Sequence, residues 1–231
     1  GVECITNASV SSVSRTEDGG IALRLDHGGC VQGITGTHLL VAVGRMPATD
    51  DLNLDAAGVK TDDRGFIGVD DQCRPNVPHI YAWGEVRGKG AFTHTSVHDG
   101  RVFLSALEGG SKRISDRVSP YALFIDPPLA RLGMTEREAR EANIPYRVAT
   151  KRMDTISRAK EKGETLGLIK IMVDSRDDTL CGASVCGVGA DEVIGMLALA
   201  MQARLRYQVI RDTVLPHPTV GELIPWMFSG L

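Results

Sequence analysis

The segment at residues 167–185 reads GLIKIMVDSRDDTLCGASV and decides the fold class of the second half of the chain. Two apolar-rich runs, 167–173 and 179–185, flank a polar link at residues 175–178 that has the composition of a turn. Because both runs have the length of strands, we expect a β-hairpin. This part of the chain is therefore predicted to contain an antiparallel sheet.

Helices and further strands are predicted on both sides of this hairpin. Residues 191–203 form a long helical pattern that is apolar on two sides, so the helix needs burial nearly all round, in part against another subunit. Upstream, residues 121–125 and 146–150 have strand composition. Between them, Thr135 and Glu138 form a capping box that opens a short helix. The pattern predicts an α+β domain, with an antiparallel sheet flanked by helices.

The first half of the chain has the composition of β structure. Residues 8–13 and 21–25 are predicted as strands joined by a turn. Residues 39–43, LLVAV, form a continuous apolar run, as expected for a strand buried on both faces, and the run ends at Gly44. Glycine at that point allows close approach of a neighbour or ligand.

The middle of the chain resembles a ligand-binding strand and helix. Residues 65–70 are predicted as a short strand, and residues 79–85 as a buried strand that ends in Gly84 and Glu85. A carboxylate at the end of such a strand is placed to bind a ribose or ribitol hydroxyl. A helix is expected over residues 95–107, and its free N–H groups suit an electron-rich ligand edge.

Composition excludes several classes of protein. The 231 residues carry a formal net charge of −3 without a long basic run, which does not suggest a nucleic-acid partner. No apolar run approaches the roughly 20 residues needed to span a bilayer, and the N-terminus has no signal-peptide pattern. The chain begins Gly1-Val2-Glu3-Cys4, which has the character of a cut inside a longer protein. Five widely spaced cysteines suit a reducing, cytoplasmic setting.

Catalysis is suggested by His217 and Glu222, which are five residues apart in LPHPTVGE. Histidine can take and return a proton near neutral pH, and a nearby carboxylate can orient the ring and stabilise its charged form. The alternative is structural. Thr219 and Glu222 also fit a capping box, in which the carboxylate only bonds the backbone at a helix start.

Three other clusters have simpler interpretations. Cys181 and Cys186 have the spacing of a redox pair, but residues five apart on a strand face opposite sides. His94 and His98 have metal-ligand spacing on a helix without a third ligand, so a position beside a non-metal ligand or in solvent is favoured. The charged run at residues 158–162 is typical of a solvated face.

The motifs also occur in a recognisable order. Residues 41–47 read VAVGRMP, residues 77–85 read VPHIYAWGE and residues 92–96 read FTHTS, ahead of His217 and Glu222. Over essentially the whole chain they resemble the C-terminal half of the flavin-dependent pyridine nucleotide–disulfide oxidoreductases, the family of dihydrolipoamide dehydrogenase, glutathione reductase and mercuric reductase. Within it, residues 122–129 are similar to the mercuric-reductase-like branch and its reactive-chlorine-resistance flavoproteins. Mercuric reductase itself has a C-terminal vicinal cysteine pair that this chain lacks.

The resemblance implies three parts. Residues 1–44 would end an NAD(P)-binding domain and residues 45–115 would contact FAD, both being remnants of α/β domains, while residues 116–231 would form the dimerisation domain. Cofactor-binding positions carried over by the motifs are Gly44, Gly84, Glu85, Phe92 and Thr93.

The sequence departs from the family pattern in three ways. Glu85 replaces an aspartate, His94 replaces a proline, and neither Gly-x-Gly-x-x-Gly nor the redox Cys-x4-Cys in its Gly-Gly-Thr-Cys setting is present. A chain without these last two motifs is expected to hold little or no FAD.

Two functions follow as hypotheses. In the first, NAD(P)H reduces FAD, the flavin reduces a cysteine pair, and His217 of the opposite subunit of a homodimer handles the proton exchanged with a small disulfide or metal-ion substrate. In the second, the chain is a dimerisation module without activity or flavin. Visible absorbance by bound flavin distinguishes them. The electron acceptor and the choice of NADH or NADPH stay open.

Overall fold

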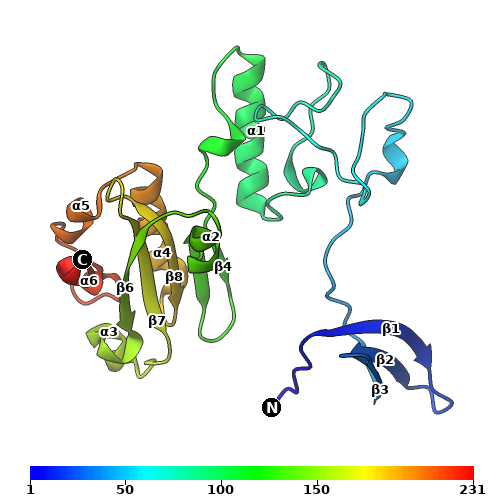
Figure 1. The fold of residues 1–231 in the computed structure, drawn as a ribbon, viewed down its shortest axis with the longest axis horizontal. Helices are drawn as coiled ribbons and strands as arrows, with labels where there is room; N and C mark the ends of the chain where they lie inside the picture. The colour runs from blue at the N-terminus through cyan, green and yellow to red at the C-terminus, as the bar shows by residue number, and fades with distance from the viewer. The chain divides into compact units, whose positions relative to one another are not determined.

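The computed structural model describes all 231 residues and divides the chain into two units, Gly1–Met46 and Pro47–Leu231. The first unit is a three-stranded antiparallel sheet in the order β1-β2-β3 (Figure 1). Its strands are β1 (Ala8–Arg15), β2 (Ile21–His27) and β3 (Cys30–Gly36). The two strands predicted here are confirmed, because each run alternates and is closed by a glycine-containing turn.

The predicted strand at residues 39–43 is wrong. These residues have no strand pairing, and Leu40 and Val43 are 90% and 89% exposed. A strand of this type needs neighbouring strands and an apolar layer on each face. The first unit supplies neither, since Leu25 is its one buried hydrophobic residue. Gly44 has a φ of +116° with open space around its Cα, so no close neighbour explains it within this chain.

The second unit begins with mostly irregular chain. Neither predicted strand forms. Residues 65–70 contribute only an isolated bridge between Thr61 and Ile67, and the stretch ending at Glu85 leads into a 3₁₀-helix, η2 (Gly84–Arg87). A small cluster of Val59, Ile67 and Ala82 packs this region. Strand composition was present, but no partner strand lies beside either segment to complete a ladder.

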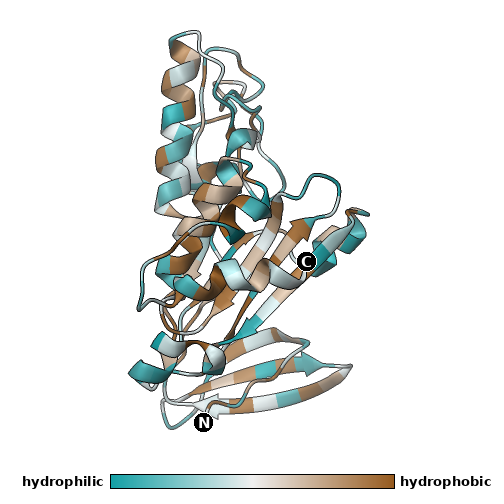
Figure 2. Ribbon diagram, turned by 90° about the vertical axis from the view of Figure 1, so that its left-hand side faces the viewer, coloured by the Kyte–Doolittle hydropathy of each residue, from teal (hydrophilic) through white to brown (hydrophobic).

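Helix α1 (Thr93–Leu107) confirms the predicted helix. Its buried residues recur every three or four positions, so one face of the helix packs and the other meets solvent. Figure 2 shows the corresponding alternation of hydrophilic and hydrophobic residues along the helix. The buried positions are Thr95, Asp99, Val102 and Ala106.

A five-stranded sheet in the order β4-β5-β8-β7-β6 dominates the rest of the unit, and all of its pairings are antiparallel (Figure 1). The predicted hairpin is its β7–β8 pair, with Ile171 opposite Ala183. Strand β5 was not predicted. The strands are β4 (Tyr121–Leu123), β5 (Leu129–Gly133), β6 (Tyr146–Arg152), β7 (Leu168–Asp174) and β8 (Leu180–Cys186).

Helices pack around this sheet, with α4 against β5 and β8. The capping box of Thr135 and Glu138 is present at the start of α2. Leu199 of α4 is 72% exposed, so this chain alone does not surround the helix. The helices are α2 (Glu136–Glu141), α3 (Ser157–Lys162), α4 (Ala190–Gln202), α5 (Tyr207–Arg211) and α6 (Ile224–Met227).

The C-terminal segment needs a correction. The sequence pattern predicts one last helix from Thr219 to about Phe228, with Trp226, Met227 and Phe228 facing a partner surface. In the structure this segment is broken into η5 (Gly221–Leu223), α6 and η6 (Phe228–Gly230), with Pro225 opening α6. Trp226 is 71% exposed as expected, but Phe228 is 1% exposed. Phe228 packs on Tyr207 with ring centroids 5.6 Å apart, because it closes the core rather than facing a partner.

A buried carboxylate joins the irregular segment, α1 and the chain entering the sheet. Asp99 is fully buried and binds Arg87 (Nε to Oδ2, 2.6 Å) and Arg117 (Nη1 to Oδ1, 2.6 Å). The backbone N–H of Gly84 also donates to Oδ2 at 3.1 Å. Burial opposes ionisation, but these hydrogen bonds outweigh it and hold the pKa of Asp99 below its ordinary value of 3.8. We call this set, Asp99 with Gly84, Arg87 and Arg117, the Asp99 junction.

Two glycines test the packing of the sheet and its helix. A methyl group at Gly182 would meet the carbonyl oxygen of Met134 at 2.1 Å, whereas Gly195 on α4 has open space. We expect Gly182→Ala to lower the free energy of unfolding by about 2–3 kcal/mol through overpacking. Gly195→Ala should raise it by about 0.5–1 kcal/mol through helix propensity. Urea denaturation measures both, and equal effects of the same sign would contradict this packing.

Removing the charge at Asp99 should destabilise the protein by about 3 kcal/mol near neutral pH, because the buried Arg87 and the largely buried Arg117 lose their charged partner. The pKa of Asp99 is lowered by folding, so its contribution is present above 3.8 and is lost as the pH falls below that value. The difference between wild type and Asp99→Asn should therefore shrink in acid. Denaturation across pH measures this, with Glu108→Gln at the exposed end of α1 as the control. A difference independent of pH would contradict the junction.

Candidate functional site

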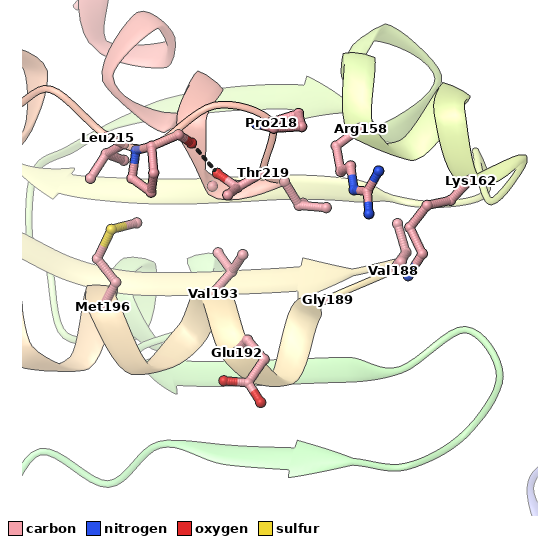
Figure 3. A pocket seen from close by; sticks show the side chains of 13 residues that line it. Arg158, Lys162, Val188, Gly189, Glu192, Val193, Met196, Leu215, Pro218 and Thr219 are labelled. Atoms are coloured by element: carbon pink, nitrogen blue, oxygen red, sulfur yellow. Dashed lines mark hydrogen bonds between the residues drawn. The ribbon is translucent and has the colours of Figure 1, made fainter.

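The proposed catalytic pair is assembled where the loop after α5, which carries His217, meets η5, which contains Glu222. His217 Nδ1 lies 2.8 Å from Glu222 Oε2. The Glu222 side chain is 10% exposed and the His217 side chain is 73% exposed, so a sheltered carboxylate holds a ring that projects outward. The hydroxyl of Thr219 donates to the carbonyl of Pro216 at 2.8 Å, which braces the loop on both sides of His217 (Figure 3).

This geometry fits proton exchange at the outer ring nitrogen. A carboxylate only accepts hydrogen bonds, so the Nδ1 atom facing Glu222 carries a proton. The Nε2 atom is left to accept a proton from a reacting group and to return it. When the ring is charged, the adjacent Glu222 carboxylate stabilises it.

The structural alternative is also partly realised. The backbone N–H of Thr219 donates to the same Glu222 Oε2 at 3.3 Å, as in a capping box. The reciprocal bond is missing, because the Thr219 hydroxyl faces Pro216. Glu222 therefore holds both the loop backbone and the His217 ring, and its capping contact positions the carboxylate that meets the imidazole.

Glu222, but not His217, borders a cavity of about 380 Å³. Glu222 lines it together with Leu215 of the same loop, Val214 and Trp226. Val214 is 95% exposed, and with Trp226 it forms an apolar rim. The sheltered Glu222 carboxylate thus lies between the exposed ring of His217 and a partly apolar cavity.

Most of the expected flavin contacts gather at the start of α1. Gly84 has a φ of +79°, and a side chain there would lie 3.1 Å from the hydroxyl of Ser96 in the first turns of α1. Glu85 follows in η2. Phe92 is the N-cap and Thr93 the first residue of α1, and no side chain caps the free N–H groups there. These N–H groups fit one electron-rich edge of a ligand such as a flavin. Gly44 belongs to the first unit.

The two helix histidines have other partners. His94 Nε2 lies 2.9 Å from the carbonyl oxygen of Pro120, and His98 Nδ1 lies 3.3 Å from an Arg117 nitrogen. His94 also stacks beside Phe92, with centroids 5.3 Å apart. The structure holds no group of three or more His, Cys, Asp or Glu side chains suited to a metal ion. The metal interpretation of this pair therefore has no support.

The cysteines form no disulfide, in agreement with the prediction for Cys181 and Cys186. Burial raises the pKa of the Cys181 thiol to about 11, so it stays protonated near neutral pH and is a poor nucleophile. Cys73 is fully buried beside the Asp99 junction, and burial likewise raises its pKa to about 11.

The sequence-based prediction missed the Asp99 junction, which holds Gly84 against α1. The sequence does contain a signal for this junction, because Thr95, Asp99 and Val102 share one face of the predicted helix. An acidic side chain on a buried face needs a cationic partner. The positions of its partners Arg87 and Arg117, which lie in irregular segments, follow no local period. No helix of the structure is long and apolar enough to cross a bilayer.

Comparisons with known proteins agree on one family. The model for the pyridine nucleotide–disulphide oxidoreductase dimerisation domain matches residues 119–228, and the pyridine nucleotide–disulphide oxidoreductase model matches residues 1–100. The chain is 35% identical to the probable pyridine nucleotide–disulfide oxidoreductase RclA of Escherichia coli, over 99% of this chain and 51% of that protein. It is 34% identical to dihydrolipoyl dehydrogenase of Geobacillus stearothermophilus, over 96% and 47% of the two chains.

Solved structures show the same fold. The Cu(II) complex of the HOCl-induced flavoprotein disulfide reductase RclA from Escherichia coli superposes with a TM-score of 0.85 at 32% identity, over 96% of this chain and 50% of that one. LpdA from Mycobacterium tuberculosis gives a TM-score of 0.86 at 24% identity, over 96% and 48%, and supports the fold alone. The chain spans about half the length of the relatives it matches. It belongs to the pyridine nucleotide–disulfide oxidoreductase family, with the α+β dimerisation domain of that family in its second half.

Proposed function

We propose that this chain supplies the FAD-contacting segment, the dimer interface and the acid–base pair of a flavin-dependent NAD(P)H:disulfide or metal-ion oxidoreductase. The observation that carries the proposal is the His217–Glu222 contact of 2.8 Å, in the part of the chain that matches the dimerisation domain. Family membership supports FAD and NAD(P)H as the cofactors.

The residues of this chain would divide the work. Bound FAD would supply the passage of electrons from NAD(P)H toward the substrate. The first turn of α1 would hold one flavin edge through its free N–H groups, and the Asp99 junction would keep Gly84 and Glu85 beside that turn. His217 would take up or release a proton through Nε2 as the substrate is reduced. Glu222 would fix the ring and stabilise its charge.

The pair is proposed to act on the partner subunit of a homodimer. The His217 ring is largely exposed, and Glu222 holds its inner nitrogen, so the outer nitrogen is directed away from the core of its own domain. Exposed apolar side chains on the same domain, Leu199 and Trp226, would be buried by association through residues 116–231.

The substrate is proposed to be a small disulfide or a metal ion. One solved relative holds Cu(II), and relatives named dihydrolipoyl dehydrogenase point to a dithiol–disulfide couple. With either substrate, the group that this chain offers at the His217–Glu222 pair is an imidazole that can carry a proton, and not a set of metal-ligating side chains. This favours a role for His217 in the proton exchange of the substrate step.

Replacing His217 should separate the two halves of the reaction in the full-length protein. We expect His217→Ala to slow the substrate step by about 100-fold, the loss expected for a general acid–base group, while flavin reduction by NAD(P)H keeps its rate. Glu222→Gln should give a smaller loss in the same step, because the ring stays but loses its charged partner. Stopped-flow absorbance follows each half-reaction, with His27→Ala on β2 as the control. Equal slowing of both half-reactions would sink the proposal.

A further inference from the structure

A second cavity, of about 370 Å³, lies beneath the loop that carries His217. Its walls come from α3, from the first turns of α4, and from residues 215, 216 and 218–221 (Figure 3). The volume is in the range of small-molecule sites. Neither His217 nor Glu222 lines it, so this groove is separate from the catalytic pair.

The groove has an apolar end and a cationic end. Figure 3 shows Met196 and Leu215 at one end, Val193 along one side, and Arg158 and Lys162 together at the other end. Both cations come from α3, one helical turn apart, so they converge on the same space. The groove therefore favours a molecule with a negatively charged head and an apolar body.

The two cations can exchange their present partners. Arg158 pairs with Glu161 at 3.2 Å and Lys162 with Glu164 at 3.5 Å, and all four side chains are about half exposed. Pairs of this kind contribute little to stability, because water screens them. A ligand carboxylate shielded by the groove would compete with them, and arginine binds carboxylates through two parallel hydrogen bonds.

The acidic residues of the groove do not cancel this charge. Glu192 lines the cavity, but Figure 3 shows its carboxylate directed away from Arg158 and Lys162. Asp191 and Glu192 form the acidic first turn of α4 and offset the positive end of the helix. Selection of an anion thus depends on the two α3 cations rather than on the helix terminus.

We propose that this groove binds an aliphatic monocarboxylate, with the carboxylate between Arg158 and Lys162 and the chain lying over Val193 toward Met196 and Leu215. A small inorganic anion would leave the apolar end empty. A neutral aliphatic molecule would leave the two cations without a partner. Only a ligand with both features uses the whole groove.

A ligand bound in the groove would also contact the loop that carries His217. Pro216 and Pro218 line the groove and flank His217 in the sequence, so a bound chain contacts the loop on both sides of the imidazole. That consequence rests on the function proposed for His217. The binding site itself does not, because His217 contributes nothing to its lining.

The test is a titration of the 231-residue protein with decanoate, followed by the ¹³C-methyl NMR signals of its methionines. We expect a saturable shift of Met196, which lines the groove, and none of Met172, which lies in the sheet. Decanol and inorganic phosphate should bind at least ten times more weakly than decanoate. No shift at Met196, or equal binding of decanol, would overturn the proposal.

Substitutions test whether Arg158 and Lys162 bind the carboxylate of decanoate. Arg158→Gln combined with Lys162→Gln should weaken decanoate binding at least tenfold, with circular dichroism as the check on folding. Lys160→Gln, on the same helix but outside the groove, should change nothing. Unchanged binding by the double variant would contradict the site. Binding only when sedimentation shows the dimer dissociated would assign the groove to a second copy instead. His217→Ala should bind decanoate normally, so a failed catalytic test would leave this result standing.

Discussion

The buried carboxylate of Asp99 is the constraint on which the second unit depends. It brings Gly84, Arg87 and Arg117 to one point on α1, although these residues lie in irregular segments that carry few ladder hydrogen bonds. A charge fully removed from water is tolerated only with such partners. The start of α1, where a flavin edge would lie, is thereby tied through Arg117 to the chain that enters the five-stranded sheet.

The proposed catalytic pair likewise uses one carboxylate for two contacts. One oxygen of Glu222 accepts from the backbone of Thr219 and meets the ring of His217. The helix-capping and catalytic interpretations therefore describe one arrangement, in which the cap positions the carboxylate. Because the carboxylate is sheltered and the imidazole is not, the ring is held in place while its outer nitrogen can meet a substrate.

Local pattern predicted the elements that depend on local interactions. The hairpin at β7–β8, helix α1 and the Thr135 capping box are each determined by neighbours along the chain, and each was predicted. The strand predictions at residues 39–43 and 79–85 failed because a buried strand pairs with strands far away in the sequence. Local composition does not reveal those partners. Phe228 was placed outside for the same reason, since only the fold brings Tyr207 to it. Arg158 and Lys162 were assigned to a solvated face, and their convergence on a groove required the packing of α3 beside α4.

His217 is proposed to serve the flavin site of the partner subunit rather than that of its own subunit. Hybrid dimers of the full-length protein test it most directly, with His217→Ala in one subunit and Gly84→Val in the other. Valine at residue 84 would require an unfavourable positive φ and would crowd Ser96, which should disable that subunit's own flavin contact. The account predicts that both parent homodimers lose most of their turnover, by about 100-fold for His217→Ala, and that the hybrid regains turnover at one site. A hybrid that forms but stays as slow as the homodimers would show that the imidazole acts within its own subunit, and would contradict the account.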